Sequence, residues 1–265
     1  METIELLSPA RNLKCAIAAI NSGADAVYIG ATCFNARKSA GNSLSDIELL
    51  VKYAHIFNVK IYVTLNTILD DKELQEAKKL IDELYKIKVD AIIIQDFGIL
   101  YLSAENKLSP IVLHMSTQCD IRNLKKVKFF ENIGAKRVVL AREMPLDEIA
   151  KISKNTNIEL ECFIHGALCM SYSGQCYMSY INGGRSANRG ECAQPCRKKY
   201  SLKDADGNDV PSSSNPCWTY KDNDSKKWIY GLPPESERLD PKILFLNFDT
   251  DPYTDGWAKL IYDTP

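Results

Sequence analysis

The chain has 265 residues, of which 45% are hydrophobic and 25% are charged. This is an ordinary globular composition, and the chain is long enough to bury one sizeable core. Its formal net charge of −1 gives no general attraction to a polyanion, so any binding of nucleic acid must come from a local basic patch. The sequence has neither an export-signal pattern at its start nor an apolar run approaching 18 residues, and we expect a cytoplasmic protein without membrane segments.

Short β-branched runs alternate along the chain with segments whose apolar residues recur at helical spacing. Strands are expected at 4–7, 26–29, 60–65, 91–94, 111–114, 137–140 and 159–163. This alternation predicts an α/β protein with a parallel sheet, and consecutive units of this length favour a TIM-type (β/α) barrel over an open doubly wound sheet. No eighth unit is recognisable, so the barrel is expected to be incomplete or irregularly closed, with 242–248 as the only strand readable near the end.

Polar residues follow most of the expected strands, at the end where barrels of this type carry their active sites. Turn formation explains the small ones, but several side chains are larger than a turn requires. These are Glu5, Gln95, His114, Gln118, Arg142, Glu143 and His165. We expect a pocket at this end, bordered by all of these except Glu5 and also by Asn66, and the candidate catalytic residues are His165, His114, Glu143 and Arg142.

Four of the nine cysteines fall within 28 residues, directly after the last expected strand, with the spacing C-x6-C-x15-C-x3-C. They are Cys169, Cys176, Cys192 and Cys196. Four thiolates can hold a tetrahedral zinc or a four-iron cluster, because soft sulfur ligands select these metals. The spacing therefore predicts a metal centre, with ordinary thiols as the alternative. Cys15 and Cys162 are interpreted as ordinary buried thiols, whereas Cys33, Cys119 and Cys217 are not assigned.

The cysteine-rich stretch is also basic, and tyrosines are interleaved with its charges. The basic residues considered for RNA binding are Arg185, Arg189, Arg197, Lys198 and Lys199. A stretch of this kind suits phosphates and stacked bases, although a solvated basic face is an equally good explanation.

Composition divides the chain into three parts: βα barrel units over 1–168, a cysteine-rich metal-binding block over 169–205, and a divergent, irregular tail over 206–265. The last 55 residues contain seven of the eleven prolines and all three tryptophans. They show no clear helical period, so the tail is not expected to add a normal barrel unit.

The cysteine-rich region closely resembles a known family. Residues 161–176, ECFIHGALCMSYSGQC, resemble the U32 peptidase signature E-x-F-x-H-G-A-x-C-x-S-x-S-G-x-C, and residues 183–197, GGRSANRGECAQPCR, are similar to the next block of that family. Segments 5–10, 23–30, 116–118 and 137–143 agree as well, so the resemblance covers about 2–205. After about Asp209 the tail lacks the S-P-K-D-L and S-x-K-I-E-G-R segments of the family.

The U32 family is named for collagenase-like peptidases, but members also hydroxylate carbon 5 of a pyrimidine in ribosomal or transfer RNA. In such members, cysteines of this block hold iron–sulfur clusters. The resemblance thus implies an enzyme with a four-iron, four-sulfur cluster on Cys169, Cys176, Cys192 and Cys196. The fourth ligand is left open because some relatives take it from the region that is missing here, and zinc is the alternative metal.

RNA modification is the preferred hypothesis for function, with ribosomal or transfer RNA as the partner. Peptide hydrolysis is an alternative, since a cysteine such as Cys169 beside His165 can act as a nucleophile; motifs typical of metalloproteases and serine hydrolases are absent from the sequence. A truncated, non-catalytic family member is the third hypothesis. The sequence does not predict the RNA or peptide target, the oxygen donor or the oligomeric state.

Overall fold

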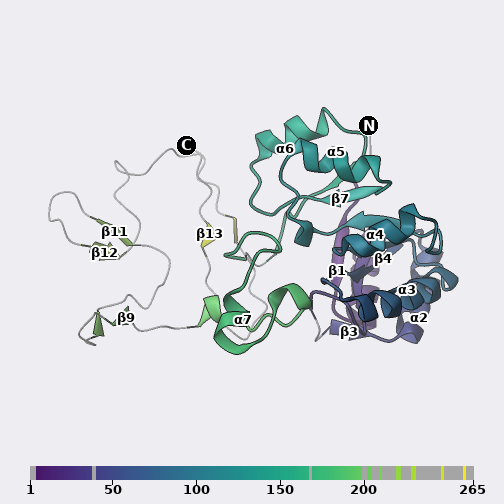
Figure 1. The fold of residues 1–265 in the computed structure, drawn as a ribbon, viewed down its shortest axis with the longest axis horizontal. Coiled ribbons are helices and arrows are strands. Elements are labelled where there is room, and N and C mark those ends of the chain that lie inside the picture. Colours follow the sequence, from purple (N-terminus) through teal and green to yellow (C-terminus); the bar gives the residue numbers. More distant parts are fainter. Residues whose placement is uncertain are drawn as a thin grey trace. The chain divides into compact units, whose positions relative to one another are not determined.

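The computed structural model describes residues 4–37, 40–166 and 169–198, together with the backbone of short strands beyond residue 201. The chain divides into two compact units, Met1–Ile164 with Cys169–Ala193 and His165–Leu168 with Gln194–Pro265. Figure 1 shows the course of the chain, with the N-terminal strands in purple and helix α7 in green.

The first unit is built on one parallel sheet with strand order β1-β2-β4-β5-β6-β7-β8, to which β3 is added beside β2. The strands are β1 (Leu7–Ala10), β2 (Ala26–Ala31), β3 (Gly41–Asn42), β4 (Lys60–Leu65), β5 (Ala91–Ile94), β6 (Val112–Met115), β7 (Arg137–Val139) and β8 (Glu159–Glu161). The sheet is curled into a half-barrel, and among the described strands its ladder ends at β1 and β8. This confirms the expected incomplete TIM-type barrel.

Helices connect the strands and lie around the outside of the sheet (Figure 1). They are α1 (Leu13–Asn21), α2 (Leu44–Ile56), α3 (Asp71–Lys86), α4 (Phe97–Ala104), α5 (Leu124–Asn132) and α6 (Leu146–Ser153). A Ser, Asn or Asp side chain accepts a hydrogen bond from the first turn of every helix from α1 to α5. Such caps satisfy backbone N–H groups that have no partner within the helix, so the local sequence fixes where each helix begins.

The two faces of the sheet have different surroundings. Side chains such as Ile61, Val63 and Ile92 point outward into the main hydrophobic core beneath the helices, whereas Tyr62 and Ile93 belong to a smaller cluster on the inner face. Successive strand residues alternate between the faces. The strand parity therefore identifies which charged residues lie inside the half-barrel.

One strand prediction needs correction. The first strand begins at Leu7 and contains Pro9, although it was expected at 4–7 with Pro9 in the following turn. Proline is tolerated there because β1 is an edge strand that pairs only with β2. Glu5 therefore precedes β1 and lies at the amino ends of the strands. Near the end of the chain, β13 (Leu246–Asn247) pairs with β14 (Lys259–Leu260) and does not join the main sheet.

The cysteine-rich stretch forms short elements: α7 (Met178–Gly183), the 3-10 turns η3 (Ala187–Arg189) and η4 (Pro195–Arg197). A further 3-10 turn, η2 (Thr117–Cys119), follows β6. The remaining strands are β9 (Leu202–Lys203), β10 (Asp209–Val210), β11 (Thr219–Lys221) and β12 (Trp228–Tyr230). Within the described parts of the chain, none of the helices is long and apolar enough to cross a membrane.

Candidate active site at the carboxyl ends of the strands

The cysteine segment, defined here as Cys169–Ala193, is held against the carboxyl ends of the central strands by Ser173. This side chain is fully buried. Its Oγ donates to Glu143 Oε2 and its backbone N–H donates to Glu143 Oε1, both at 3.1 Å. Arg122 Nη2 donates to the same carboxylate at 2.7 Å and lies over the ring of Tyr172, 4.6 Å from its centroid. Burial works to raise the pKa of Glu143, but these hydrogen bonds and the charge of Arg122 outweigh it. The pKa of Glu143 is therefore lowered.

Gly174 makes the closest approach of the segment to the barrel. A Cβ added at this position lies 2.0 Å from the carbonyl oxygen of Gln118, and its φ of +72° belongs to the left-handed region. Only glycine fits both constraints. Gly184 has a similar φ of +68° but nothing within 4 Å of an added Cβ. Substitutions at the two positions therefore share the backbone strain, and only the one at Gly174 adds a steric contact.

We expect Gly174→Ala to lower the free energy of unfolding by about 1–3 kcal/mol more than Gly184→Ala, because only the first substitution forces side-chain atoms into backbone. Urea unfolding of both variants measures the difference. Equal losses at the two positions would show that the segment is not docked through Gly174.

A second anchor of the cysteine segment lies over β2 and β4. Arg189 Nη1 donates to Ile68 O at 3.2 Å, and Nη2 forms an ion pair with Glu73. Glu73 also closes the capping box of α3 by accepting from the backbone N–H of Asp70. Hydrogen bonds from Arg189 and then Asp70 lower the pKa of Glu73. The Arg189 side chain, expected to contact RNA, is thus bonded within the protein.

Three polar residues predicted at the carboxyl ends form one network. Asn66 Nδ2 donates to Ser116 Oγ at 3.2 Å, and the same oxygen accepts from the backbone N–H of Gln118 at 3.2 Å. Gln95 Nε2 donates to Gln118 O at 3.4 Å. Asn66, Gln95 and Gln118 are therefore brought together.

The other predicted side chains have different positions. Arg142 and Glu143 lie beside this network, since the backbone N–H of Arg142 donates to Ser173 Oγ at 3.4 Å. His114 lies within β6, 3% exposed, on the inner face of the half-barrel and not at the end of a strand. His165 belongs to the second unit.

Strands β4, β7 and β8 carry a charged cluster on the inner face that we did not predict. Arg137, with a 9% exposed side chain, donates to Glu5 Oε1 at 2.6 Å and to Glu159 Oε2 at 2.5 Å. Tyr62 and Lys60 donate to the Glu5 carboxylate at 2.9 Å. Burial works to raise the pKa of Glu5, but the hydrogen bonds from Arg137 and Lys60 outweigh it and lower the pKa to about 2.

Two further groups on this face have strongly shifted pKa values. Burial, aided by the charge of Arg137, lowers the pKa of His114 to about 3. Burial raises the pKa of Glu161 to about 7 against the opposing charge of Arg137. The sequence did contain a signal for this cluster, because Arg137, Glu159 and Glu161 stand at inward-facing positions of strands that were expected to be largely apolar.

The described structure does not bring the predicted metal ligands together. Cys169 and Cys192 are exposed and Cys176 is partly buried, while Cys196 belongs to the second unit. Four thiols are chemically suited to zinc or an iron–sulfur cluster. However, no group of three His, Cys, Asp or Glu side chains that could hold a metal ion occurs among the residues that the structure describes. The metal centre stays a prediction.

The assignment of the other cysteines was partly wrong. Cys15 and Cys162 are exposed, because Cys15 lies on the outer side of α1 and Cys162 follows the edge strand β8. Cys119 is the buried thiol, and burial raises its pKa to about 12. Cys217 and the basic residue Lys199 lie outside the residues whose side chains are described.

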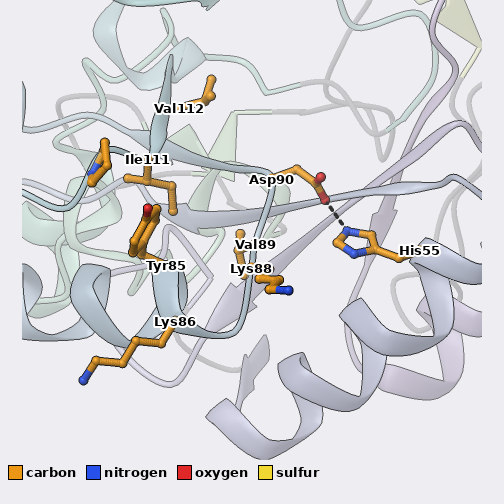
Figure 2. Close-up of a pocket in the computed structure, with 9 residues that line it drawn as sticks. His55, Tyr85, Lys86, Lys88, Val89, Asp90, Ile111 and Val112 are labelled. Carbon is orange, nitrogen blue, oxygen red and sulfur yellow. Dashed lines mark hydrogen bonds and ion pairs between the residues drawn. The ribbon is translucent and has the colours of Figure 1, made fainter.

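Two pockets border the sheet at opposite ends. One of about 490 Å³ lies between the ends of α2 and α3 and the segments entering β5 and β6, where Figure 2 shows His55 hydrogen-bonded to Asp90. Another, of about 240 Å³, lies at the carboxyl ends of β2 and β4, beside Cys33, Glu73 and Arg189. The pocket at the carboxyl ends is lined by none of the residues that were expected to border it. The cysteine segment packs over the carboxyl ends of the strands. Asp90, which lines the larger pocket, accepts a hydrogen bond from the backbone N–H of Ile61 and so has a structural role.

An open parallel (β/α) barrel with a polar network at its carboxyl ends defines a TIM-type barrel protein. The family model for peptidase family U32 matches residues 11–238. The chain belongs to this family, as the signature residues predicted. The match runs past residue 205, where the resemblance was expected to end.

Several relatives of known name match the chain. The 23S rRNA 5-hydroxycytidine C2501 synthase of Escherichia coli (strain K12) is 54% identical over 221 residues, 83% of this chain and 33% of that protein. The tRNA hydroxylation protein P of Helicobacter pylori (strain 26695) is 41% identical over 204 residues, 76% of this chain and 48% of the relative. A Porphyromonas gingivalis collagenase is 36% identical over 216 residues, 76% of this chain and 51% of the relative.

The chain thus spans about a third to a half of the length of these relatives. Among solved structures, the U32 peptidase Mk0906 has a TM-score of 0.54 and 13% identity, and the match covers 64% of this chain and 72% of that one. This likeness supports the fold alone.

Proposed function

We propose that the protein is an RNA-modifying enzyme that hydroxylates a pyrimidine in ribosomal or transfer RNA. The observation that carries this proposal is the 54% identity to a ribosomal-RNA hydroxycytidine synthase over 83% of the chain. That identity is higher than the 36% shared with the collagenase. The polar network at the carboxyl ends supports an active site there, because TIM-type barrels place their chemistry at that end.

We propose that Cys169, Cys176, Cys192 and Cys196 hold a four-iron, four-sulfur cluster. Their soft thiolate chemistry supports this assignment, and zinc is the alternative. When bound, such a cluster supplies one-electron chemistry that protein side chains lack. The protein itself positions the segment that carries three of these thiols, through the Ser173–Glu143 and Arg189–Glu73 contacts.

RNA binding is proposed to involve the basic residues of the cysteine-rich block, chiefly Arg185, Arg197, Lys198 and Lys199. Arg185 Nε donates to Glu191 O at 3.0 Å, which holds this side chain at the surface of the segment. Tyr177 and Tyr180 are 61% and 58% exposed and offer flat rings on which bases can stack.

We expect the double variant Arg185→Glu with Lys198→Glu to bind RNA more weakly and to show a shallower dependence of log K on log salt, by about 1.5, because two phosphate contacts are lost. Filter binding across a salt series measures both changes. Lys52→Glu with Lys72→Glu, at exposed positions on α2 and α3, is the charge-matched control. An equal effect in the control would mean that the block has no special role in binding.

The proposed function is tested by nucleoside mass spectrometry of ribosomal and transfer RNA from cells with and without the gene. The expected result is loss of one hydroxylated pyrimidine in the deletion and its return when the gene is restored. Unchanged nucleosides, together with peptide hydrolysis by the purified protein, would contradict the proposal and favour the peptidase alternative.

A further inference from the structure

Buried polar atoms without a hydrogen-bond partner cluster in one part of the described structure. They are Gln95 Oε1, His114 Nδ1, Arg142 Nε and Glu161 Oε2. All four side chains come from β5, β6, β7 and β8 or from the three residues that follow each strand, and these are consecutive strands of the sheet. Leaving a buried polar group without a hydrogen bond is unfavourable, so their concentration in one region points to a ligand that satisfies them.

His114 and Glu161 share the inner face of the half-barrel. His114 pairs with Arg137 in the ladder, and Glu161 pairs with Val139, two residues further along the same strand. The Tyr62 ring meets His114 edge to face, with ring centroids 4.8 Å apart. Layers inside such barrels are usually filled by branched apolar side chains from alternate strands. Here β4, β6 and β8 supply a phenol, an imidazole and a carboxyl group instead.

Glu161 has the weakest contact with Arg137 among the carboxyl groups of this face. The Arg137 guanidinium is hydrogen-bonded to Glu5 and Glu159, whereas it forms only a longer ion pair, at 3.6 Å, with Glu161 Oε2, which has no hydrogen-bond partner. The side chain of Glu161 is 16% exposed. It lies on β8, which ends the ladder of the main sheet among the described strands.

The chemistry of the two groups indicates what they bind. Neutral His114 carries one donor and one acceptor nitrogen, and Glu161 Oε2 offers a lone pair. Tyr62 and the partly buried Tyr28 add flat apolar surface on the same face. A flat, uncharged ring with N–H groups on its edge matches this combination.

We propose that the inner face at β6 and β8 receives the unpaired pyrimidine base that is to be modified, with Glu161 accepting a hydrogen bond from the exocyclic amino group of cytosine. This inference rests on the proposed function. Enzymes that act on a base take it out of its stack, and carboxylates accept hydrogen bonds from the amino group of cytosine. His114 completes the contact through Nδ1.

The test uses deletion cells that express the full gene with Glu161→Leu, which removes the acceptor while keeping similar volume. We expect the hydroxylated fraction of the target nucleotide to fall at least about tenfold, with wild-type protein levels. Glu159→Leu is the matched control: it lies on the same strand and bonds the same Arg137, but its side chain is 61% exposed. Hydroxylation in the control should stay within about twofold of wild type.

Binding provides a readout that does not depend on catalysis. Wild-type protein should bind an RNA fragment carrying the target cytidine more tightly than the same fragment with an abasic site, and this preference should disappear in Glu161→Leu. If Glu161→Leu folds poorly, Glu161→Gln takes its place in this comparison. Glutamine keeps an acceptor oxygen and suits a buried site, so this variant should retain part of the preference.

The outcomes separate the two proposals. If the wild-type gene restores no hydroxylated pyrimidine, the proposed function fails. If wild type restores it and Glu161→Leu does so equally, or if Glu159→Leu is as damaging as Glu161→Leu, only the assignment of Glu161 to the base is overturned.

Discussion

Replacing Arg137 with leucine is expected to lower the free energy of unfolding at pH 7 by about 3–5 kcal/mol, the usual cost of leaving buried charges without their partner. The side chains of Glu5 and Glu161, which lie next to Arg137, are only 20% and 16% exposed. Urea unfolding of wild type and variant measures the loss.

The loss should depend on pH in a defined direction. Burial works to raise the pKa of Glu5, but hydrogen bonds from Arg137 and Lys60 outweigh it. The pKa therefore falls from 4.5 to about 2 in the folded protein. A lowered carboxyl pKa contributes stability that is present above the unfolded pKa and is lost as pH falls through the folded pKa. The difference between wild type and Arg137→Leu should therefore shrink as pH decreases from 4.5 towards 2.

Lys60→Leu is the control for Arg137. Lys60 bonds the same Glu5 carboxylate, but its side chain is 55% exposed, so its loss should cost less than about 1 kcal/mol. A loss below about 1 kcal/mol in Arg137→Leu as well would show that the inner cluster is solvated and contributes little to stability.

Cys176→Ser is expected to reduce the iron content of anaerobically purified protein by about tenfold or more, and to remove the visible absorption of the cluster. A directly bound thiolate should matter at least as much as the outer partners of a metal ligand, whose loss costs about 10–100-fold in affinity. Iron, sulfide and zinc analysis with a visible spectrum measures the effect and distinguishes a cluster from zinc.

Cys15→Ser is the matched control, because Cys15 is an exposed thiol on α1 outside the four-cysteine pattern. Its iron content should equal that of wild type. Iron that is unchanged in Cys176→Ser, or missing from anaerobic wild type, would contradict the cluster assignment.

The sequence predicted the barrel well because hydrophobic periodicity reports directly which faces are buried. The runs at 60–65 and 91–94 appear as β4 and β5 with the expected limits. The first strand was misplaced because Pro9 was interpreted as a strand breaker, and sequence alone does not show that β1 is an edge. The two-residue strand β3 is too short to leave a periodic signal.

The candidate site was harder to predict, since it depends on contacts between segments far apart in the chain. Asn66, Gln95 and Gln118 were found because each follows a strand in a parallel sheet. Ser173 was missed as an anchor because its partner, Glu143, is 30 residues away. Glu161 was noted only within a family signature, and its special state arises from burial beside an Arg137 that already serves other carboxylates.

We propose that the RNA hydroxylation inferred for this chain depends on the cysteine segment over the carboxyl ends of the strands. The most direct test restores deletion cells with wild type, Cys176→Ser or Cys15→Ser and measures the hydroxylated pyrimidine in their RNA by nucleoside mass spectrometry. We predict that wild type and Cys15→Ser restore the nucleoside, whereas Cys176→Ser leaves it at the deletion level. Full restoration by Cys176→Ser, or no change in any hydroxylated pyrimidine when the gene is deleted, would contradict the account.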